Sequence, residues 1–319
     1  MKIDVILITY NQKQYIAQAV ESILMQRVND DVQVRVIVAD DCSKDGTLEI
    51  IKSYEVKSPY QFIYLSAEKN MGIAANYKRA YAATEAEYVA VLEGDDWWTD
   101  VNRLQKHIDY LSIHTDCVMT KNNYMQYSQR HNEWSVEQSN ARILTLRQEL
   151  RNYVLANMSC TVFRGSLLRT MDDRVYEYGH NQWREATDWY THIYLLQYGY
   201  AYVLNDLMSV YRVDTNSNVS KTGRTDKEML DRGYMCYQQS LALIGDNYKA
   251  ECCWRYEEAK QIVNECKRNI IFQKWSNYLP PFLAKLFVYF VPSLCWYLKH
   301  CIRQMIPNGL YKRVKKSIV

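Results

Sequence analysis

Four short apolar runs alternate with amphipathic stretches in the first part of the sequence. The runs are rich in branched residues, as are strands buried on both faces, and they are Val5–Ile8, Val34–Ala39, Phe62–Leu65 and Tyr88–Leu92. Between them, apolar positions recur with helical spacing, first at Ile16, Val20 and Ile23. The same spacing predicts helices over about 45–51, 73–83 and 104–111, and Cys117–Thr120 predicts a further short strand. This order predicts an α/β fold with right-handed crossovers and a mostly parallel sheet flanked by helices.

Composition and charge narrow the class of protein. The chain has 319 residues, of which 48% are apolar and 24% charged, which is the balance of a globular protein with a sizeable core. A net charge of only +3 is too weak to indicate nucleic acid as a partner. The nine cysteines are odd in number and form no CxxC pair, so we expect reduced thiols in a cytoplasmic protein. The segment Met1–Asp4 lacks the layout of a signal peptide.

Polar and acidic residues follow the predicted strands, where open parallel sheets bind ligands. The first strand ends in Thr9-Tyr10-Asn11, the second in Asp40-Asp41 and the fourth in Glu93-Gly94-Asp95-Asp96. Two acidic clusters at one sheet edge favour a bound cation or the hydroxyl groups of a ribose. The alternative is that the carboxylates only cap turns and helices. No G-x-G-x-x-G follows the first strand and no P-loop occurs.

Four motifs carry a family resemblance. They are Ile8-Thr9-Tyr10-Asn11, Val38-Ala39-Asp40-Asp41 continuing to Thr47, Asn70-Met71-Gly72 with Asn76, and Leu92-Glu93-Gly94-Asp95-Asp96-Trp97-Trp98. Their order and spacing over residues 3 to about 115 resemble the family-2 glycosyltransferases, which are inverting enzymes with the Rossmann-like GT-A fold. The motif Glu93-Gly94-Asp95-Asp96 is similar to that of a subset of these enzymes, which build bacterial surface polysaccharides.

The resemblance implies a nucleotide-sugar site and a metal site. Asp95 and Asp96 match the metal-binding acids of the family, which implies Mg²⁺ or Mn²⁺ as cofactor; Glu93 stands where Asp is usual. A basic residue after Asn70 helps to hold the nucleotide in the family, and Lys78 and Arg79 are the candidates. The residues that the resemblance assigns to a UDP-sugar are Thr9, Tyr10, Asn11, Asp40, Asp41, Asn70, Arg79, Glu93, Asp95 and Arg212.

The second half of the chain supplies the candidate base. Asp188, in Arg184-Glu185-Ala186-Thr187-Asp188-Trp189, resembles the second acid of the family's Glu-Asp motif, which removes the acceptor proton. Thr187 replaces the usual Glu; the alternative role of Asp188 is a helix N-cap, and Glu185 is the fallback base. Arg212 resembles part of a tyrosine–arginine motif, with Asp214 where a His is common. It could pair with the donor's phosphates or form a structural ion pair.

The C-terminal region has a different character. We expect a GT-A catalytic domain over residues 1–222, with a nucleotide-sugar half (1–120) and an acceptor half (121–222), and a helical extension over 223–319. The uncharged run Leu286–Leu298 spans 13 residues, too few to cross a bilayer. Residues 266–319 hold ten Lys or Arg and no acid, so the net charge divides into +10 for this tail and −7 for the rest.

This basic, aromatic tail suits an interfacial segment on an anionic membrane, here the inner face of the cell membrane. The alternative is that its helices pack on the protein or form a homo-oligomer. For the whole chain, the sequence predicts an inverting glycosyltransferase that moves a sugar from a UDP-sugar to a hydroxyl of a lipid-linked or growing surface glycan. The alternatives are a non-catalytic glycan- or nucleotide-sugar-binding module, or a nucleotidyltransferase, which the missing phosphate loop disfavours.

Overall fold

A computed structural model describes residues 1–65, 67–152, 155, 157–179, 187–213 and 226–253. The chain divides into two compact units, residues 1–223 with 235–255, and residues 224–234 with 256–319. Of the second unit only 226–234 are described, and these begin helix α9 (Asp226–Ile244). Glu185, Asp214 and the basic tail from residue 266 onward lie outside the described residues.

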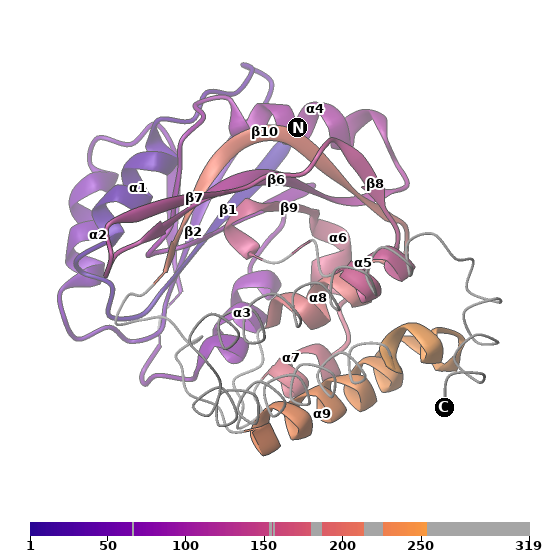
Figure 1. Ribbon diagram of the computed structural model, residues 1–319. Helices are drawn as coiled ribbons and strands as arrows, with labels where there is room; N and C mark the ends of the chain where they lie inside the picture. The colour runs from indigo at the N-terminus through magenta and orange to yellow at the C-terminus, as the bar shows by residue number, and fades with distance from the viewer. Residues whose placement is uncertain (66, 153–154, 156, 180–186, 214–225, 254–319) are drawn as a thin grey trace, which may run out of the picture. The chain divides into compact units, whose positions relative to one another are not determined.

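The first unit contains one mixed, mostly parallel sheet (Figure 1). In the described residues its strands run in the order β3-β2-β1-β4-β9-β6-β10-β5, with β7 paired to β6 and β8 to β10. The first four strands are parallel neighbours: β1 (Lys2–Thr9), β2 (Gln33–Asp40), β3 (Gln61–Tyr64) and β4 (Tyr88–Glu93). These strands confirm the four apolar runs, each within two or three residues of its predicted bounds.

The second half of the sheet contains more strands than the sequence patterns predicted. They are β5 (Trp97–Trp98), β6 (Cys117–Ser128), β7 (Glu133–Glu137), β8 (Arg142–Leu144), β9 (Thr161–Arg164) and β10 (Tyr200–Val213). β9 is antiparallel to both β4 and β6 and lies between them, whereas β6 is parallel to β10. The strand predicted at Cys117–Thr120 is therefore the start of a much longer one.

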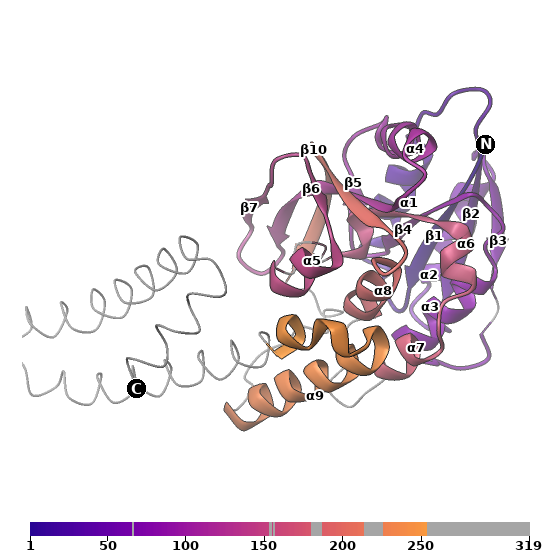
Figure 2. The ribbon, with the colours of Figure 1, turned by 90° about the vertical axis from the view of Figure 1, so that its right-hand side faces the viewer.

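Helices cover both faces of this sheet (Figures 1 and 2). One hydrophobic cluster joins the sheet to α1 (Ile16–Leu24), α2 (Thr47–Glu55) and α4 (Arg103–Ile113). A second cluster joins the other face to α3 (Ile73–Ala82), α5 (Leu146–Asn152), α6 (Gly165–Arg169), α7 (Arg174–Gly179) and α8 (Thr187–Leu195). Residues of β1 alternate between the two clusters, as the pleat of a strand requires.

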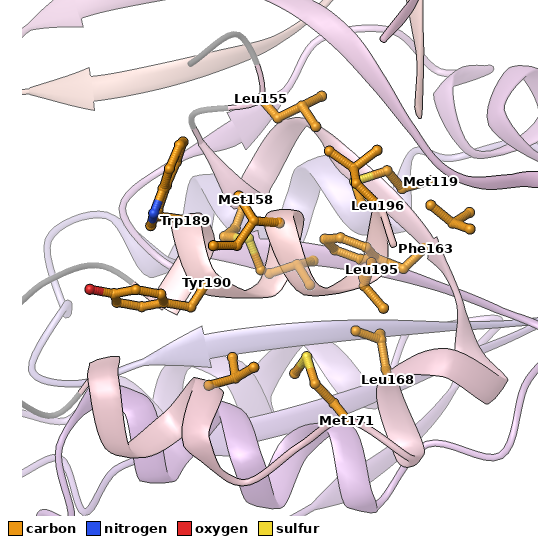
Figure 3. Packing of buried hydrophobic residues seen from close by; sticks show 14 of the residues in the cluster. Met119, Leu155, Met158, Phe163, Leu168, Met171, Trp189, Tyr190, Leu195 and Leu196 are labelled. Atoms are coloured by element: carbon orange, nitrogen blue, oxygen red, sulfur yellow. The ribbon is translucent and has the colours of Figure 1, made fainter. Parts of the chain in front are cut away.

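Helix α8 is anchored by its apolar residues. Figure 3 shows Trp189, Tyr190 and Leu195 packed among side chains of the sheet and of α6. Trp189 Nε1 also donates a hydrogen bond to Ser240 Oγ at 2.9 Å. This packing fixes the first turn of α8, where Asp188 lies. No helix within the described ranges is both long and apolar enough to cross a membrane.

A buried ion pair holds together the amino ends of the central strands. Asp4 of β1 is fully buried, and its two oxygens accept hydrogen bonds from Arg35 Nε and Nη2 at 2.8 and 2.9 Å. The same carboxylate accepts the backbone N–H groups of Glu85 and Ala86 before β4. One side chain thus links β1 and β2 to the segment that leads into β4.

We expect Asp4→Ala to lower the free energy of unfolding by about 3–5 kcal/mol, because it leaves Arg35 and two buried N–H groups without their acceptor. Urea unfolding followed by circular dichroism measures the change. Glu85→Ala is the matched control, since Glu85 bonds the same guanidinium but is 76% exposed, and we expect it to cost at most about 1 kcal/mol. Equal losses in the two variants would contradict the role assigned to Asp4.

Candidate active site at the carboxyl edge of the sheet

The ends of β1, β2 and β4 lie side by side. Thr9 is in register with Asp40, and Ile8 with Glu93. Gly94 follows Glu93 and is packed so tightly under the first loop that an added Cβ would lie 2.4 Å from Gln12 Oε1 and 2.9 Å from Ile16 Cδ1. The glycine therefore allows the acidic turn to approach the loop after β1. The two acidic clusters of the sequence meet at one edge of the sheet, as the strand order predicted.

Asp40 and Asp41 organise the loops at this edge. Asp41 is 3% exposed, and its two oxygens accept the backbone N–H groups of Met71 and Gly72, each at 2.9 Å. Asp40 accepts the N–H of Ser43 at 3.0 Å and also the Ser43 hydroxyl. Both carboxylates thus hold turns of the protein, which is the capping role that the sequence left open. Their predicted contacts with uracil and ribose stay a prediction.

The loops beside them carry three further predicted residues. Tyr10 is 43% exposed, so its ring is free to meet a ligand. Asn11 has a positive φ of 51° and accepts the backbone N–H of Lys44 at 2.8 Å. Asn70 accepts the N–H of Gly72 at 3.0 Å. These contacts fix the shape of the loops around the edge.

Of the two basic candidates on α3, Arg79 is the one at the sheet edge. Its Nη2 donates to the carbonyl oxygen of Asp40 at 2.6 Å and its Nε to Asn76 Oδ1 at 2.8 Å. Burial lowers the pKa of Arg79, although the charges of Asp41 and Asp40 oppose this effect. Lys78 instead pairs with Asp173 at 2.8 Å, where both side chains are largely exposed.

Glu93 is a carboxylate held in an unfavourable environment. Burial, followed by the charge of Asp95, raises the pKa of Glu93 to about 7. The Tyr77 hydroxyl donates to Glu93 Oε1 at 2.8 Å and opposes this shift. The charge of Asp188 adds to it. The structure therefore brings the candidate base from α8 into electrostatic range of the acidic turn, across 95 residues of sequence.

Asp96 is the most enclosed acid of the site. Its side chain is 1% exposed, and it accepts the Ser159 hydroxyl at 2.6 Å and the backbone N–H of Arg212 at 2.9 Å. Burial and the charges of Asp95 and Glu93 raise its pKa well above the usual range. Asp95, its neighbour, is only half-buried. Asp96 therefore joins β4 to β10 and to the 3₁₀ turn η1 (Met158–Cys160), while Asp95 is the more accessible acid.

Arg212 joins the acidic turn to a group of aromatic rings. Its Nε donates to the carbonyl oxygen of Asp95 at 2.9 Å, and its guanidinium carbon lies 4.5 Å from the ring centre of Trp97 and 4.9 Å from that of Tyr15. Its other nitrogens donate to Gln129 and Gln18. These contacts are with amides, a carbonyl and aromatic faces. Both roles suggested for Arg212, a phosphate contact and a structural ion pair, stay predictions.

Asp188 lies one residue inside α8, not at the helix N-cap. The described part of the helix begins at Thr187, and Asp188 Oδ1 accepts the N–H of Trp189 at 2.7 Å. Burial chiefly raises the pKa of Tyr77 and of Tyr211, and the charge of Asp188 adds a smaller effect to each. The position of the carboxylate in the first turn keeps it close to the positive end of the helix dipole.

The fit of a divalent cation rests on Asp95 and its neighbours. Glu93, Asp95 and Asp96 repel one another electrostatically, which a cation would relieve. Among the described residues no three His, Cys, Asp or Glu side chains are grouped so that they could hold a metal ion by themselves. Magnesium commonly binds through one or two carboxylates together with phosphates of the substrate. The acids present suit such a shared site.

Two contributors to the site were not predicted in these roles. The Ser159 hydroxyl donates to Asp96 and accepts the N–H of Glu93 at 3.1 Å. Tyr77 was not singled out, and it bonds Glu93. No periodic pattern or motif in the sequence indicates which residues Ser159 and Tyr77 contact. The contact between Ser159 and Asp96 spans 63 residues, so only the folded chain reveals it.

Comparison with known proteins identifies the family. The sequence model of the family described as Glycosyl transferase family 2 matches residues 4–172. This is more than half of the chain, and the chain belongs to this family. This is the family that the four motifs indicated. Its sheet, flanking helices and GT-A-like fold agree with that assignment.

Three relatives illustrate the similarity. A putative teichuronic acid biosynthesis glycosyltransferase, TuaG of Bacillus subtilis, is 26% identical over 71% of this chain and 84% of its own length. An uncharacterized protein of Mycobacterium tuberculosis is 39% identical over 113 residues, 35% of this chain, and the match spans about a third (32%) of that relative. The crystal structure of S. aureus TarS 1-349 in complex with UDP-GlcNAc has a TM-score of 0.62 at 21% identity, covering 81% of this chain and 71% of that one.

We expect Ser159→Ala to lower the free energy of unfolding by about 1–3 kcal/mol, because it leaves one oxygen of the buried Asp96 carboxylate and the Glu93 N–H without their partner. Chemical denaturation measures the loss. Ser53→Ala is the control: Ser53 is exposed and its hydroxyl bonds only a carbonyl of its own helix, so the expected change is within about 0.5 kcal/mol. If Ser159→Ala were as stable as the wild type, its hydroxyl would not be what holds Asp96.

Proposed function

We propose that this chain is an inverting glycosyltransferase that moves a sugar from a UDP-sugar to a hydroxyl of a lipid-linked or growing surface glycan. The observation that carries the proposal is the position of Asp188 within electrostatic range of Glu93, beside the acids predicted to bind the donor. The relative TarS was solved with UDP-GlcNAc, and TuaG is named for teichuronic acid biosynthesis. The first supports a UDP-sugar donor, and the second supports a surface glycan as acceptor.

In the proposed reaction, Asp188 acts as general base. The acceptor oxygen attacks the anomeric carbon of the donor from the side opposite UDP, its proton passes to an Asp188 oxygen, and the bond from the anomeric carbon to the phosphate oxygen breaks with its electron pair on UDP. One displacement of this kind inverts the anomeric centre. A carboxylate in this position accelerates such a step by about 10²–10⁴-fold.

Asp95 is proposed as the direct ligand of Mg²⁺ or Mn²⁺, with Asp96 as a supporting acid that holds the turn. The greater accessibility of Asp95 and the two hydrogen bonds already made by Asp96 support this division. When bound, the cation would neutralise charge on the diphosphate leaving group. Thr9, Tyr10, Asn11, Asp40, Asp41, Asn70 and Arg79 are proposed to surround the nucleotide. The basic tail is proposed to hold the enzyme on an anionic membrane surface, on the sequence argument alone.

We expect Asp188→Asn to lower kcat for UDP release by about 10²–10⁴-fold, because the amide cannot accept the acceptor proton. The KM for the donor should change little. UDP release from a panel of UDP-sugars with candidate glycans measures both constants. Asp109→Asn is the control, since Asp109 is exposed on α4. Unaltered kcat in Asp188→Asn would remove the general-base role, and the absence of UDP release from every donor would contradict the function itself.

We expect removal of divalent cations with EDTA to abolish UDP release, and added Mn²⁺ or Mg²⁺ to restore it. In Asp95→Asn, half-maximal activity should need at least about tenfold more metal, because a charged oxygen ligand is lost. A titration of activity against free Mn²⁺ gives this value. Asp109→Asn again serves as the control. Full activity in EDTA would rule out the metal role of Asp95.

A further inference from the structure

Three aromatic side chains form a surface beside the acidic turn. Trp97 of β5, Tyr127 of β6 and Trp134 of β7, here called the aromatic shelf, lie with ring centres 4.7 Å apart for Tyr127 and Trp134, 6.2 Å for Trp97 and Trp134, and 6.3 Å for Trp97 and Tyr127. We propose that this shelf binds a pyranose ring of the acceptor glycan. The inference rests on the proposed function, because it takes a sugar as the acceptor.

The register of the sheet builds the shelf. Trp134 is directly opposite Tyr127 in the antiparallel pair β6–β7, and Tyr127 is directly opposite Arg212 in the parallel pair β6–β10. Trp97 is opposite Val210, two residues before Arg212. Residues opposite each other on neighbouring strands share a face. Three strands therefore place Trp134, Tyr127 and Arg212 in one row.

Arg212 connects the shelf to the candidate active site. Its guanidinium carbon lies 4.5 Å from the ring centre of Trp97 and 5.6 Å from that of Tyr127, close enough for a cation–π interaction with each. Its Nε donates to the carbonyl oxygen of Asp95. A single side chain thus spans from the acid proposed to bind the metal to the shelf. A pyranose ring bound on the shelf would therefore lie next to the candidate active site.

The exposed part of the shelf has the chemistry of a sugar-binding surface. Trp134 is 56% exposed, and an exposed aromatic face can cover the apolar C–H face of a pyranose. Polar groups lie at its border: the Tyr127 hydroxyl donates to Asn132 Oδ1 at 2.9 Å, and Gln129 accepts from Arg212. Tyrosine and tryptophan are suited to such half-apolar, half-polar contacts. Their hydrogen-bonding neighbours could reach the ring hydroxyls.

The charge around Trp134 argues against a membrane as the occupant. Glu133 and Glu137 lie on the same strand, and every residue of β7 is exposed. Both side chains point to the face of β7 opposite Trp134, yet two carboxylates on this exposed strand would repel an anionic lipid surface. A neutral oligosaccharide meets no such repulsion. The exposed tryptophan is therefore assigned to a glycan.

The test uses the full chain and immobilised oligosaccharides of glucose, galactose and N-acetylglucosamine, without donor. We expect the wild type to bind at least one of them, and Trp134→Ala to weaken that binding at least about tenfold, as for loss of an aromatic anchor. Trp134→Phe should retain most of the affinity, because it keeps an aromatic ring. Val136→Ala is the matched control, since Val136 is similarly exposed on the same strand at 55%.

Equal binding by Trp134→Ala and the wild type, or no binding of any oligosaccharide by the wild type, would overturn the inference. So would a concentration-dependent dimer that Trp134→Ala abolishes, since the shelf would then bind a second copy of the chain. Calorimetric titration of the wild type with UDP reports separately on the proposed function. Without UDP binding, Trp134-dependent glycan binding would still support the shelf.

Discussion

The buried carboxylate of Asp96 is the constraint around which the site is arranged. It accepts a hydroxyl from η1 and a backbone N–H from β10, so the turn after β4 is bonded to two segments far along the chain. An ionised carboxylate in so enclosed a position is costly unless its oxygens are satisfied. The two hydrogen bonds offset part of that cost and fix where its neighbour Asp95 lies. Asp96, which is buried, therefore positions Asp95, which is more accessible.

The acids of the site store electrostatic repulsion. The raised pKa values of Glu93 and Asp96 both arise from burial and from neighbouring carboxylates. The Asp4–Arg35 pair at the opposite ends of the strands shows the contrast, because there a buried acid has a cation in direct contact. The protein thus pairs charges where they only stabilise the fold. Where a substrate and a cation are proposed to bind, acids lie together, and a bound cation would stabilise their charged forms.

The sequence predicted the first half of the fold well, because that half is built from local signals. Each apolar run predicts one strand, and the helical spacing at Ile16 to Leu24 predicts one helix. Parallel strands must then be joined by crossover connections. The second half depends on pairing between distant strands. β9 lies between β4 and β6 although its residues follow those of β6 in the chain, and no local pattern indicates that order. β7 is exposed throughout, so it has no apolar face to predict it. The strand-end motifs likewise named the acids, whereas the partners Ser159 and Tyr77 lay beyond sequence reasoning.

Arg212 contacts both the acidic turn and the aromatic shelf. Its backbone N–H bonds Asp96, its Nε bonds the Asp95 carbonyl, and its guanidinium faces Trp97 and Tyr127. In the structure these donors have protein partners, and the phosphate contact that the sequence suggested for Arg212 stays a prediction. Burial lowers the pKa of Arg212, yet an arginine stays charged. The position of the acidic turn is therefore coupled to that of the aromatic rings, so a change on the shelf that moves Trp97 would also displace the acids.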